Sequence, residues 1–502
     1  MKKALQLSNA NKAPGPSGIK FAIVKLLPSN YIKTIINIFN AIIATKYWPT
    51  SFKFVNMMFI HKINKSKTDP LSFRPISLIE PFAKLFEKLI TNRLNYYLEY
   101  HNILPSNQFG FRTGKSTTHS IYFIKEKVLE NKKQHKTTLI ATRDVEKAFD
   151  KVWFKGLLFK INNYFPNQPE MLAFFYNYLT NRKITPYFNN EKGFSFSPKA
   201  GVPQGSCLGP VLYLIFVSDI PPPIFPDTTI SQYADDIIHT VTSDSKGKNK
   251  TKNAIKKLQH ELDHTLNWER NWKIKTNIQK CKINYSGTTS EIITYFGGIF
   301  TENIELSIEN PLRILGYHLN NYLSELSQIH ECTKKANTQI NRLYRFSHAP
   351  PAVKRHLYLA LVQPLLTYPN TTLHQCNKTN ISKLQKVQNK GVRFITNTKL
   401  NDRLKSENLH VMAKIEPINV RIHKLAKKTL YKLKENYTSE NNQFPPTILF
   451  DSEYNYNVDR LNPPKISISE QIESEFKQNR KLLINTIPND PENFVIPIAI
   501  YT

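Results

Sequence analysis

The sequence has few cysteines and no long apolar run. Its four cysteines are scattered without a C-x-x-C pair: Cys207, Cys281, Cys332 and Cys376. This spacing indicates neither a disulfide framework nor a zinc site, and reduced intracellular thiols are expected. The amino terminus has no apolar core of the signal-peptide type, and no run approaches the roughly 18 apolar residues of a membrane span. We therefore expect an intracellular protein that does not contact a membrane.

Acidic residues are also in short supply. The 38 Asp and Glu are outnumbered by 69 Lys and Arg, which gives a formal net charge of +31. A chain this basic is expected to meet a polyanion, and nucleic acid is the leading partner. The 24 Tyr and 30 Phe among its 502 residues argue against disorder and offer faces on which bases can stack. The length suits two to four domains.

Three of the few carboxylates occur in an informative pattern. Asp235 and Asp236 are adjacent within an apolar stretch that reads as a hairpin from Ile230 to Val241, and Asp144 ends an apparent strand that begins at Thr137. Unpaired buried carboxylates are costly, and a divalent cation is the natural compensation. Two Mg²⁺ ions about 3.5 to 4 Å apart stabilise the attacking and leaving oxygens of a phosphoryl transfer. The pattern predicts a nucleotidyl transferase.

Two further segments raise alternatives. Lys62 and Arg74 flank a basic loop after a strand-like run, and they are either grips for a triphosphate or solvated loop cations. Gly114-Lys115-Ser116 has the ending of a P-loop, but Phe109 stands where that motif needs a glycine, so we reject it. The preceding Gly110 and Arg112 are expected to shape a loop over template or primer.

The second half of the chain becomes helical and basic. A turn at 201–206 precedes an apolar helix, and its backbone N–H groups could face an anion. The lysine-rich stretch 243–257 is either a solvated loop, which we favour, or an edge that follows phosphates. Basic helices after residue 319 suit either a domain that holds a duplex or an ordinary helical bundle. Past about residue 436, Asn, Pro and Ser predict a poorly packed tail.

Five blocks in this order resemble the reverse transcriptases of non-LTR retrotransposons, most closely those of jockey-like mobile elements. The blocks are Phe73-Arg74-Pro75-Ile76-Ser77, Gln108-Phe109-Gly110-Phe111-Arg112, Asp144 to Asp150, Gly201 to Pro210 and Tyr233 to Asp236. The resemblance covers about residues 10–400. It implies an α+β right-hand polymerase of fingers, palm and thumb, with an antiparallel palm sheet and a helical thumb.

The resemblance also implies roles for residues. Asp144, Asp235 and Asp236 would hold two Mg²⁺ ions, with Mn²⁺ as an alternative. Phe149 would be the steric gate that selects deoxynucleotides, and Val145 would lie beside the nucleotide. Gln204 and Gly205 would contact the nucleotide or the template base, and Lys62 and Arg74 the triphosphate. Lys280 would be the general acid to the leaving pyrophosphate. The implied partners are an RNA template, a DNA primer or target and deoxynucleoside triphosphates; the oligomeric state is left open.

Two residues depart from the family pattern. Arg143 stands where an apolar strand residue is usual, and it either faces solvent or perturbs the palm; strand alternation points it away from Asp144. Ser17 replaces a usual Asp. The chain also begins at the polymerase blocks, which suggests a fragment of a decayed copy that lacks the endonuclease.

The leading hypothesis is RNA-directed DNA synthesis, in target-primed copying of element RNA. The alternatives are an impaired or co-opted remnant that binds RNA or RNA-DNA duplex, and an RNA-dependent RNA polymerase, which Phe149 disfavours. We expect fingers and N-terminal blocks in 1–130, palm in 131–295, thumb in 296–435 and a tail in 436–502. A cytoplasmic ribonucleoprotein and the nucleus are the expected locations.

Overall fold

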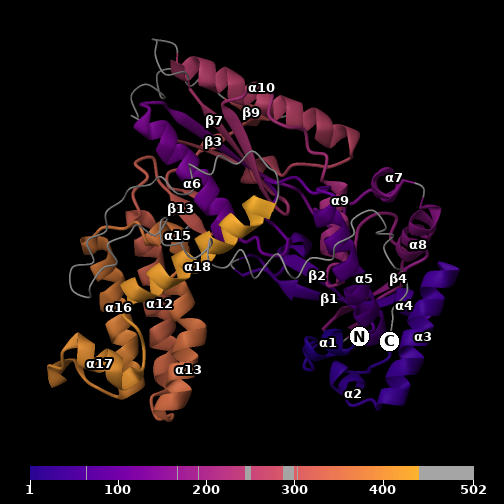
Figure 1. Ribbon diagram of the computed structural model, residues 1–502, viewed down its shortest axis with the longest axis horizontal. Helices are drawn as coiled ribbons and strands as arrows, with labels where there is room; N and C mark the ends of the chain where they lie inside the picture. Colours follow the sequence, from indigo (N-terminus) through magenta and orange to yellow (C-terminus); the bar gives the residue numbers. More distant parts are fainter. Residues whose placement is uncertain are drawn as a thin grey trace.

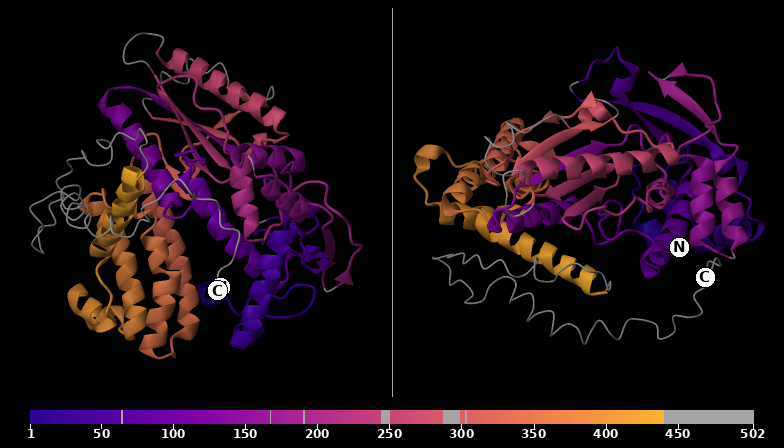
Figure 2. Two further views of the ribbon diagram at one scale, coloured as in Figure 1. Left: turned by 45° about the vertical axis from the view of Figure 1, so that its right-hand side comes forward. Right: turned by 90° about the horizontal axis from the view of Figure 1, so that it is seen from above.

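The computed structural model describes residues 1–439 apart from 64, 167, 190, 244–249, 287–298 and 302–303. Its elements form an α+β right hand, in which finger helices and thumb helices lie on either side of a central palm sheet (Figures 1 and 2). The expected fold class is thereby confirmed. No helix in the described part of the chain combines the length and apolar character that a bilayer crossing needs.

The fingers join N-terminal helices to a small mixed sheet. Their elements are α1 (Lys2–Gln6), α2 (Phe21–Lys25), α3 (Ser29–Thr45), α4 (Thr50–Lys53), β1 (Phe54–His61), η1 (Pro70–Ser72), β2 (Phe73–Leu78), α5 (Pro81–Tyr100), β4 (Lys183–Phe188) and β5 (Glu191–Lys192). The strand order is β2-β1-β4-β5. Strand β1 pairs antiparallel with β2 and parallel with β4, so the chain leaves the fingers, builds palm elements and then returns.

The palm is a mainly antiparallel sheet with helices on both faces. Its strands are β3 (Thr138–Asp144), β6 (Thr228–Tyr233), β7 (Asp236–Thr242), β8 (Lys282–Ser286) and β11 (Ser307–Ile308), in the order β11-β8-β3-β7-β6. Its helices are α6 (Thr117–Lys133), α7 (Phe154–Tyr164), α8 (Pro169–Leu179), α9 (Leu208–Phe216), α10 (Lys250–Asn271) and η2 (Ile278–Lys280). Because side chains alternate along β3, Leu139 packs under α10 while Ile140 packs against α6 on the other face.

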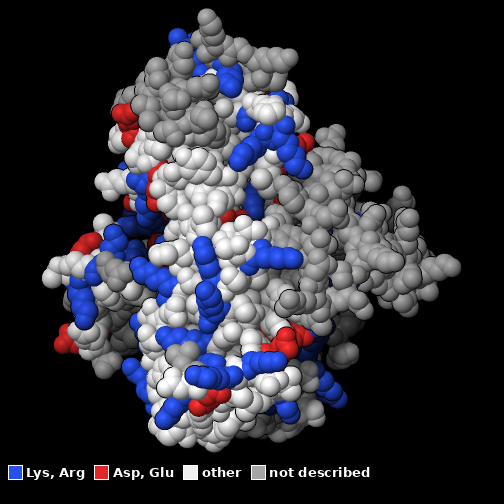
Figure 3. Space-filling view, turned by 90° about the vertical axis from the view of Figure 1, so that its left-hand side faces the viewer, with Lys and Arg blue, Asp and Glu red and all other residues white. Residues whose placement is uncertain are grey.

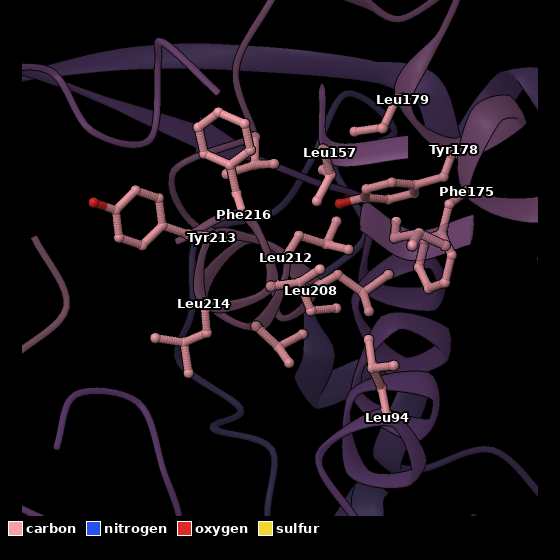
Figure 4. Packing of buried hydrophobic residues seen from close by; sticks show 14 of the residues in the cluster. Leu94, Leu157, Phe175, Tyr178, Leu179, Leu208, Leu212, Tyr213, Leu214 and Phe216 are labelled. Carbon is pink, nitrogen blue, oxygen red and sulfur yellow. The ribbon is translucent and has the colours of Figure 1, made fainter. Parts of the chain in front are cut away.

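Helix α9 is apolar all round and forms the centre of the largest core. Leu208 and Leu212 are fully buried, and Leu94, Leu157 and Phe175 from α5, α7 and α8 surround them (Figure 4). A helix without a polar face is stable only inside a protein. This core therefore fixes α9, and with it the 201–206 loop that leads into the helix.

The thumb is a helical bundle connected to the palm by short strands. The strands are β9 (Phe300–Thr301) and β10 (Ile304–Glu305), which lie beside α10, and β12 (Leu312–Ile314) and β13 (Tyr317–Leu319). The helices are α12 (Leu326–Leu343), η3 (Tyr344–Phe346), α13 (Pro351–Leu361), α14 (Gln363–Leu366), α15 (Asn370–Leu373), α16 (Lys378–Thr396), η4 (Leu400–Asp402), α17 (Ser406–Ala413) and α18 (Ile418–Ser439). The bundle has its own apolar core. Helix α18 returns to the palm, where His119 of α6 contacts the carbonyl of Thr429 at 3.2 Å.

One local expectation was wrong. The lysine-rich stretch 243–257 is not all loop, because α10 begins at Lys250: Ala254, Leu258 and Leu262 supply a helical apolar stripe that packs on the palm sheet. The predicted tail lies mostly outside the described residues, and the domain boundaries stay a prediction.

Candidate active site

The palm sheet brings the three predicted carboxylates to one end of two neighbouring strands. Asp144 is the last residue of β3 and Asp236 is the first residue of β7, and the antiparallel register pairs them directly. Opposed residues in such a pair have Cα atoms about 4.5 to 5.5 Å apart and side chains on one face. Asp235 lies in the two-residue turn between β6 and β7, where Ala234 adopts a φ of 56°.

The carboxylates destabilise one another's charge. Burial raises the pKa of Asp236 to about 7, with further contributions from the charges of Asp235 and Asp144, while Lys280 opposes the change. Burial also raises the pKa of Asp235, and the charge of Asp144 adds to this shift. The site thus holds more negative charge than its own cations neutralise, which is the condition that favours a bound cation.

Lys280 reaches this cluster from η2. Its ammonium donates to Oδ2 of Asp144 at 2.7 Å, and 62% of its side chain stays exposed. Its placement depends on the backbone, because the N–H of Asn277 donates to the carbonyl of Asp144 at 2.7 Å. The structure therefore places Lys280 beside the carboxylates.

A cleft of about 540 Å³ opens beside the carboxylates. It extends from Asp144, Asp236 and Lys280 to the turn of the β12–β13 hairpin at Leu315 and Gly316. The cleft also holds cations and one further acid: Lys282, Arg313 and Glu309. A charged cleft of this size can admit a strand end next to the carboxylates.

The donor set fits hard divalent ions. Three aspartates offer oxygen ligands, which Mg²⁺ and Mn²⁺ prefer. Within the described ranges, however, no three His, Cys, Asp or Glu side chains already form a ligand cluster. Since the Lys280 ammonium bonds Asp144, ion binding would require the carboxylates and this lysine to readjust.

The predicted gate residue lies in an aromatic group. The ring of Phe149 stacks on Tyr213 of α9 at 5.2 Å and meets Phe111 edge-on at 5.8 Å. Tyr213 is 2% exposed, so it is a fixed support. The side chain of Val145, in contrast, is buried in the main core, and only its backbone could face a nucleotide.

The loop before α9 connects the palm to the fingers. The side-chain amide of Gln204 donates to Asp150 at 3.0 Å, and the backbone carbonyl of Gln204 accepts from the N–H of Ser77 in β2 at 2.7 Å. Gly205 has a φ of 113°, and a Cβ there would lie 2.7 Å from the Ser77 carbonyl oxygen. A residue with a side chain would therefore separate the loop from the fingers sheet.

Lys62 and Arg74 remain in the fingers. The ammonium of Lys62 donates to the carbonyl of Leu71 at 2.7 Å, and Arg74 is exposed on β2 opposite Ile60. In the described part of the chain, no contact connects either cation to the aspartates. Their role at a triphosphate stays a prediction.

The structure gives Gln108 and Gly110 a role that the sequence did not suggest. Gln108 is 1% exposed, and its Oε1 accepts from the N–H of Gly110 at 2.8 Å and from that of Ala234 at 2.9 Å. A Cβ on Gly110 would lie 2.2 Å from the nitrogen of Ala234. This segment supports the turn that carries Asp235. The available signal is the Gln-Phe-Gly-Phe block, from which the sequence predicts only a loop over template or primer.

Both departures from the family pattern have partners. Arg143 points away from Asp144, as strand alternation predicted, but it is 1% exposed and bonds Glu269 at 2.8 Å, so the solvent-facing alternative was wrong. The N–H of Ser17 donates to Glu80, and the hydroxyl of Ser17 donates to the same carboxylate at 2.5 Å. An acidic residue at position 17 would meet Glu80 with like charge.

The chain is similar to a known family and to several curated proteins. Residues 63–319 match the family model described as reverse transcriptase (RNA-dependent DNA polymerase). The chain is 29% identical over 404 residues to the probable RNA-directed DNA polymerase from transposon BS of Drosophila melanogaster, covering 78% of this chain and 44% of that protein. It is 26% identical over 438 residues to the RNA-directed DNA polymerase from mobile element jockey of Drosophila funebris, covering 85% and 46%.

Among solved structures, a telomerase from Candida tropicalis in complex with a telomeric RNA fragment aligns with 84% of this chain and 68% of its own, at 13% identity and a TM-score of 0.42. The chain spans less than half the length of the two Drosophila relatives. The family match covers more than half of the chain and contains Asp144, Asp235 and Asp236. This chain therefore belongs to the reverse transcriptase (RNA-dependent DNA polymerase) family.

Proposed function

We propose that this chain is an RNA-directed DNA polymerase that extends a primer 3′-hydroxyl with deoxynucleotides. The observation that carries the proposal is the pairing of Asp144 with Asp236 across β3 and β7, with Asp235 in the adjoining turn. The template would be retrotransposon RNA, copied at a nuclear DNA target whose nicked strand serves as primer.

The aspartates would bind two Mg²⁺ ions. When bound, such ions lower the charge of the triphosphate and stabilise the attacking and leaving oxygens. The protein's own task is placement. The raised pKa of Asp236 supports this assignment, because a cation there would relieve the repulsion among the carboxylates.

Lys280 would act on the leaving group. Its contact with Asp144 supports this role, in which the ammonium would donate a proton to the departing pyrophosphate. Lys62 and Arg74 of the fingers would contact the same triphosphate from the other side. Gln204 would contact the nucleotide or the template base, with Gly205 allowing the loop to approach.

Phe149 would select the sugar. A rigid aromatic ring supported by Tyr213 cannot yield to a ribose 2′-hydroxyl, which favours deoxynucleotides and disfavours the RNA-polymerase alternative. The primer end would lie in the cleft that runs from Asp236 to Gly316.

The thumb would hold the template-primer duplex. Residues 326–439 carry 21 Lys and Arg against 5 Asp and Glu. Figure 3, which faces the thumb side of the molecule, shows Lys and Arg spread over this face with fewer Asp and Glu among them. Such a surface suits contacts to phosphates that are independent of sequence.

The position of Arg143 no longer supports the alternative that the chain is an impaired remnant. Arg143 does not disturb the palm, since its charge is paired on the face away from the aspartates. The test is incorporation of labelled deoxythymidine monophosphate on poly(rA)/oligo(dT) with Mg²⁺. We expect template-dependent synthesis that Asp235→Ala abolishes without loss of fold or RNA affinity. Synthesis by Asp235→Ala would refute the assignment, and a folded but inactive wild type would favour the remnant.

A further inference from the structure

Arg143 forms a buried polar network behind the active-site strand. Its guanidinium donates to the carbonyl of Leu262 at 3.0 Å, to Glu269 at 2.8 Å and to the hydroxyl of Thr276 at 3.0 Å. The side chains of Arg143 and Glu269 are 0% and 1% exposed. Thr276 donates in turn to both carboxylate oxygens of Glu269, at 2.8 and 2.6 Å. Arginine, glutamate and threonine thus form a closed triangle.

The third member of this triangle belongs to the segment that leads to Lys280. Thr276 forms an antiparallel bridge with Val145, the residue after Asp144. On either side of this bridge, the N–H of Glu146 donates to the carbonyl of Lys275 and the N–H of Asn277 donates to that of Asp144, both at 2.7 Å. The segment 275–277 therefore runs along 144–146 like a short extra strand.

The two sets of contacts act on the same segment from different directions. The backbone hydrogen bonds fix the register of 275–277 against 144–146. The triangle connects Thr276, the middle residue of this segment, to Glu269 of α10. Lys280 follows within one turn, where its N–H donates to the carbonyl of Asn277 at 3.0 Å. The direction of the Lys280 side chain toward Asp144 thus depends on where Thr276 is held.

We propose that Arg143 is a positioning residue for the polymerase site: by holding Glu269 and Thr276, it sets the placement of Lys280 against Asp144. This rests on the proposed function. An apolar pair of equal volume could fill the same space, but it could not direct the Thr276 hydroxyl. Arg143 therefore orients Thr276, which an apolar residue that only fills the space would not do.

A double-mutant cycle tests whether Arg143 acts through Lys280. Single-turnover incorporation would be measured for Lys280→Ala, for Arg143→Met and for the double variant. General acid-base groups contribute about 10² to 10⁴-fold, so Lys280→Ala should slow the chemical step at least about 100-fold. If Arg143 only positions Lys280, this cost should shrink to a few-fold in the Arg143→Met background, with KM for the nucleotide nearly unchanged. Independent, multiplicative effects would overturn the proposal.

Thr276→Val provides a variant that keeps both charges. It removes one hydroxyl from the triangle at nearly constant volume. Thr265→Val is the matched control, because Thr265 is also buried and its hydroxyl donates to the carbonyl of Glu261, outside the network. Amide hydrogen exchange at Asn277 and Lys280 should quicken at least several-fold in Thr276→Val and not in Thr265→Val.

Hydrogen exchange separates this inference from the proposed function. An inactive wild type would refute the polymerase assignment, whereas exchange would still report whether the triangle holds the segment. Unchanged exchange at 277–280 in folded Thr276→Val would overturn the positioning role, whatever the activity.

Discussion

The side-chain carbonyl of Gln108 accepts a hydrogen bond from the backbone N–H of Ala234 at 2.9 Å. Gln108 precedes Ala234 by 126 residues in the chain. Ala234 needs such support because its φ of 56° is strained for a residue with a side chain. The same oxygen holds the N–H of Gly110, so one buried amide fixes two segments behind Asp235.

Gln108→Leu should therefore damage both stability and catalysis. The change leaves two buried N–H groups without their acceptor, and each costs about 1 to 3 kcal/mol. We expect unfolding at lower denaturant concentration and incorporation reduced at least about tenfold, because the Asp235 turn loses its support. Gln134→Leu, at an exposed position after α6, is the control for the substitution itself. Full activity of Gln108→Leu would show that the turn holds its shape unaided.

The sequence predicted the clustering of the three aspartates better than it predicted the residues that support them. Asp144, Asp235 and Asp236 are recognisable because adjacent acids in an apolar stretch need a cation, and strand alternation correctly turned Arg143 away from them. Glu269 and Glu80 carry no such local signal, and the block that contains Gln108 does not reveal what Gln108 contacts. Each acts through a partner far along the chain, and one sequence does not reveal which distant groups meet.

The lysine-rich stretch shows a second limit. Its many lysines favour a solvated loop, although Ala254, Leu258 and Leu262 in and after the stretch have the spacing of a helix. The apolar stripe determines that the segment is helical, because its burial against the palm sheet contributes about 25 cal/mol per Å². Exposed lysines do not oppose this, since lysine is a good helix former.

The acidity of Asp236 predicts how stability depends on pH and on Mg²⁺. The pKa of a free Asp is about 3.8, and the fold raises it to about 7. The folded protein therefore binds the proton more tightly, so this group makes the fold less stable as pH rises from about 4 to about 7, and the loss remains above pH 7. A bound cation would restore the stability.

Thermal melting with and without Mg²⁺ at pH 5 and pH 8 checks this. We expect Mg²⁺ to raise the melting temperature by several degrees at pH 8 and by much less at pH 5. Asp236→Asn should melt higher than wild type at pH 8 in a chelator and should lose most of the response to Mg²⁺. Equal responses at the two pH values would contradict the raised pKa.

Phe149→Val should weaken the selection of deoxynucleotides. The smaller side chain leaves room for a 2′-hydroxyl beside Tyr213 and Phe111. We expect the ratio of kcat/KM for dTTP over UTP to fall at least about tenfold, mainly through a gain with the ribonucleotide. Phe159→Val, at an exposed ring of α7, serves as the control. An unchanged ratio would remove Phe149 as the gate.

Ser17→Asp should destabilise the fingers, although the family pattern favours an acid at this position. Glu80 is 8% exposed, and both of its oxygens accept from Ser17. An aspartate at position 17, which is itself exposed, would lose the hydroxyl donor and add like-charge repulsion beside the buried Glu80 carboxylate, at a cost of about 1 kcal/mol. Ser17→Ala keeps the backbone donor and should cost less. Denaturant unfolding of the three proteins should rank Ser17→Asp below Ser17→Ala, and Ser17→Asp combined with Glu80→Gln should recover most of the loss. If the single aspartate variant were as stable as wild type, the Ser17–Glu80 contact would not be what accommodates serine at this position.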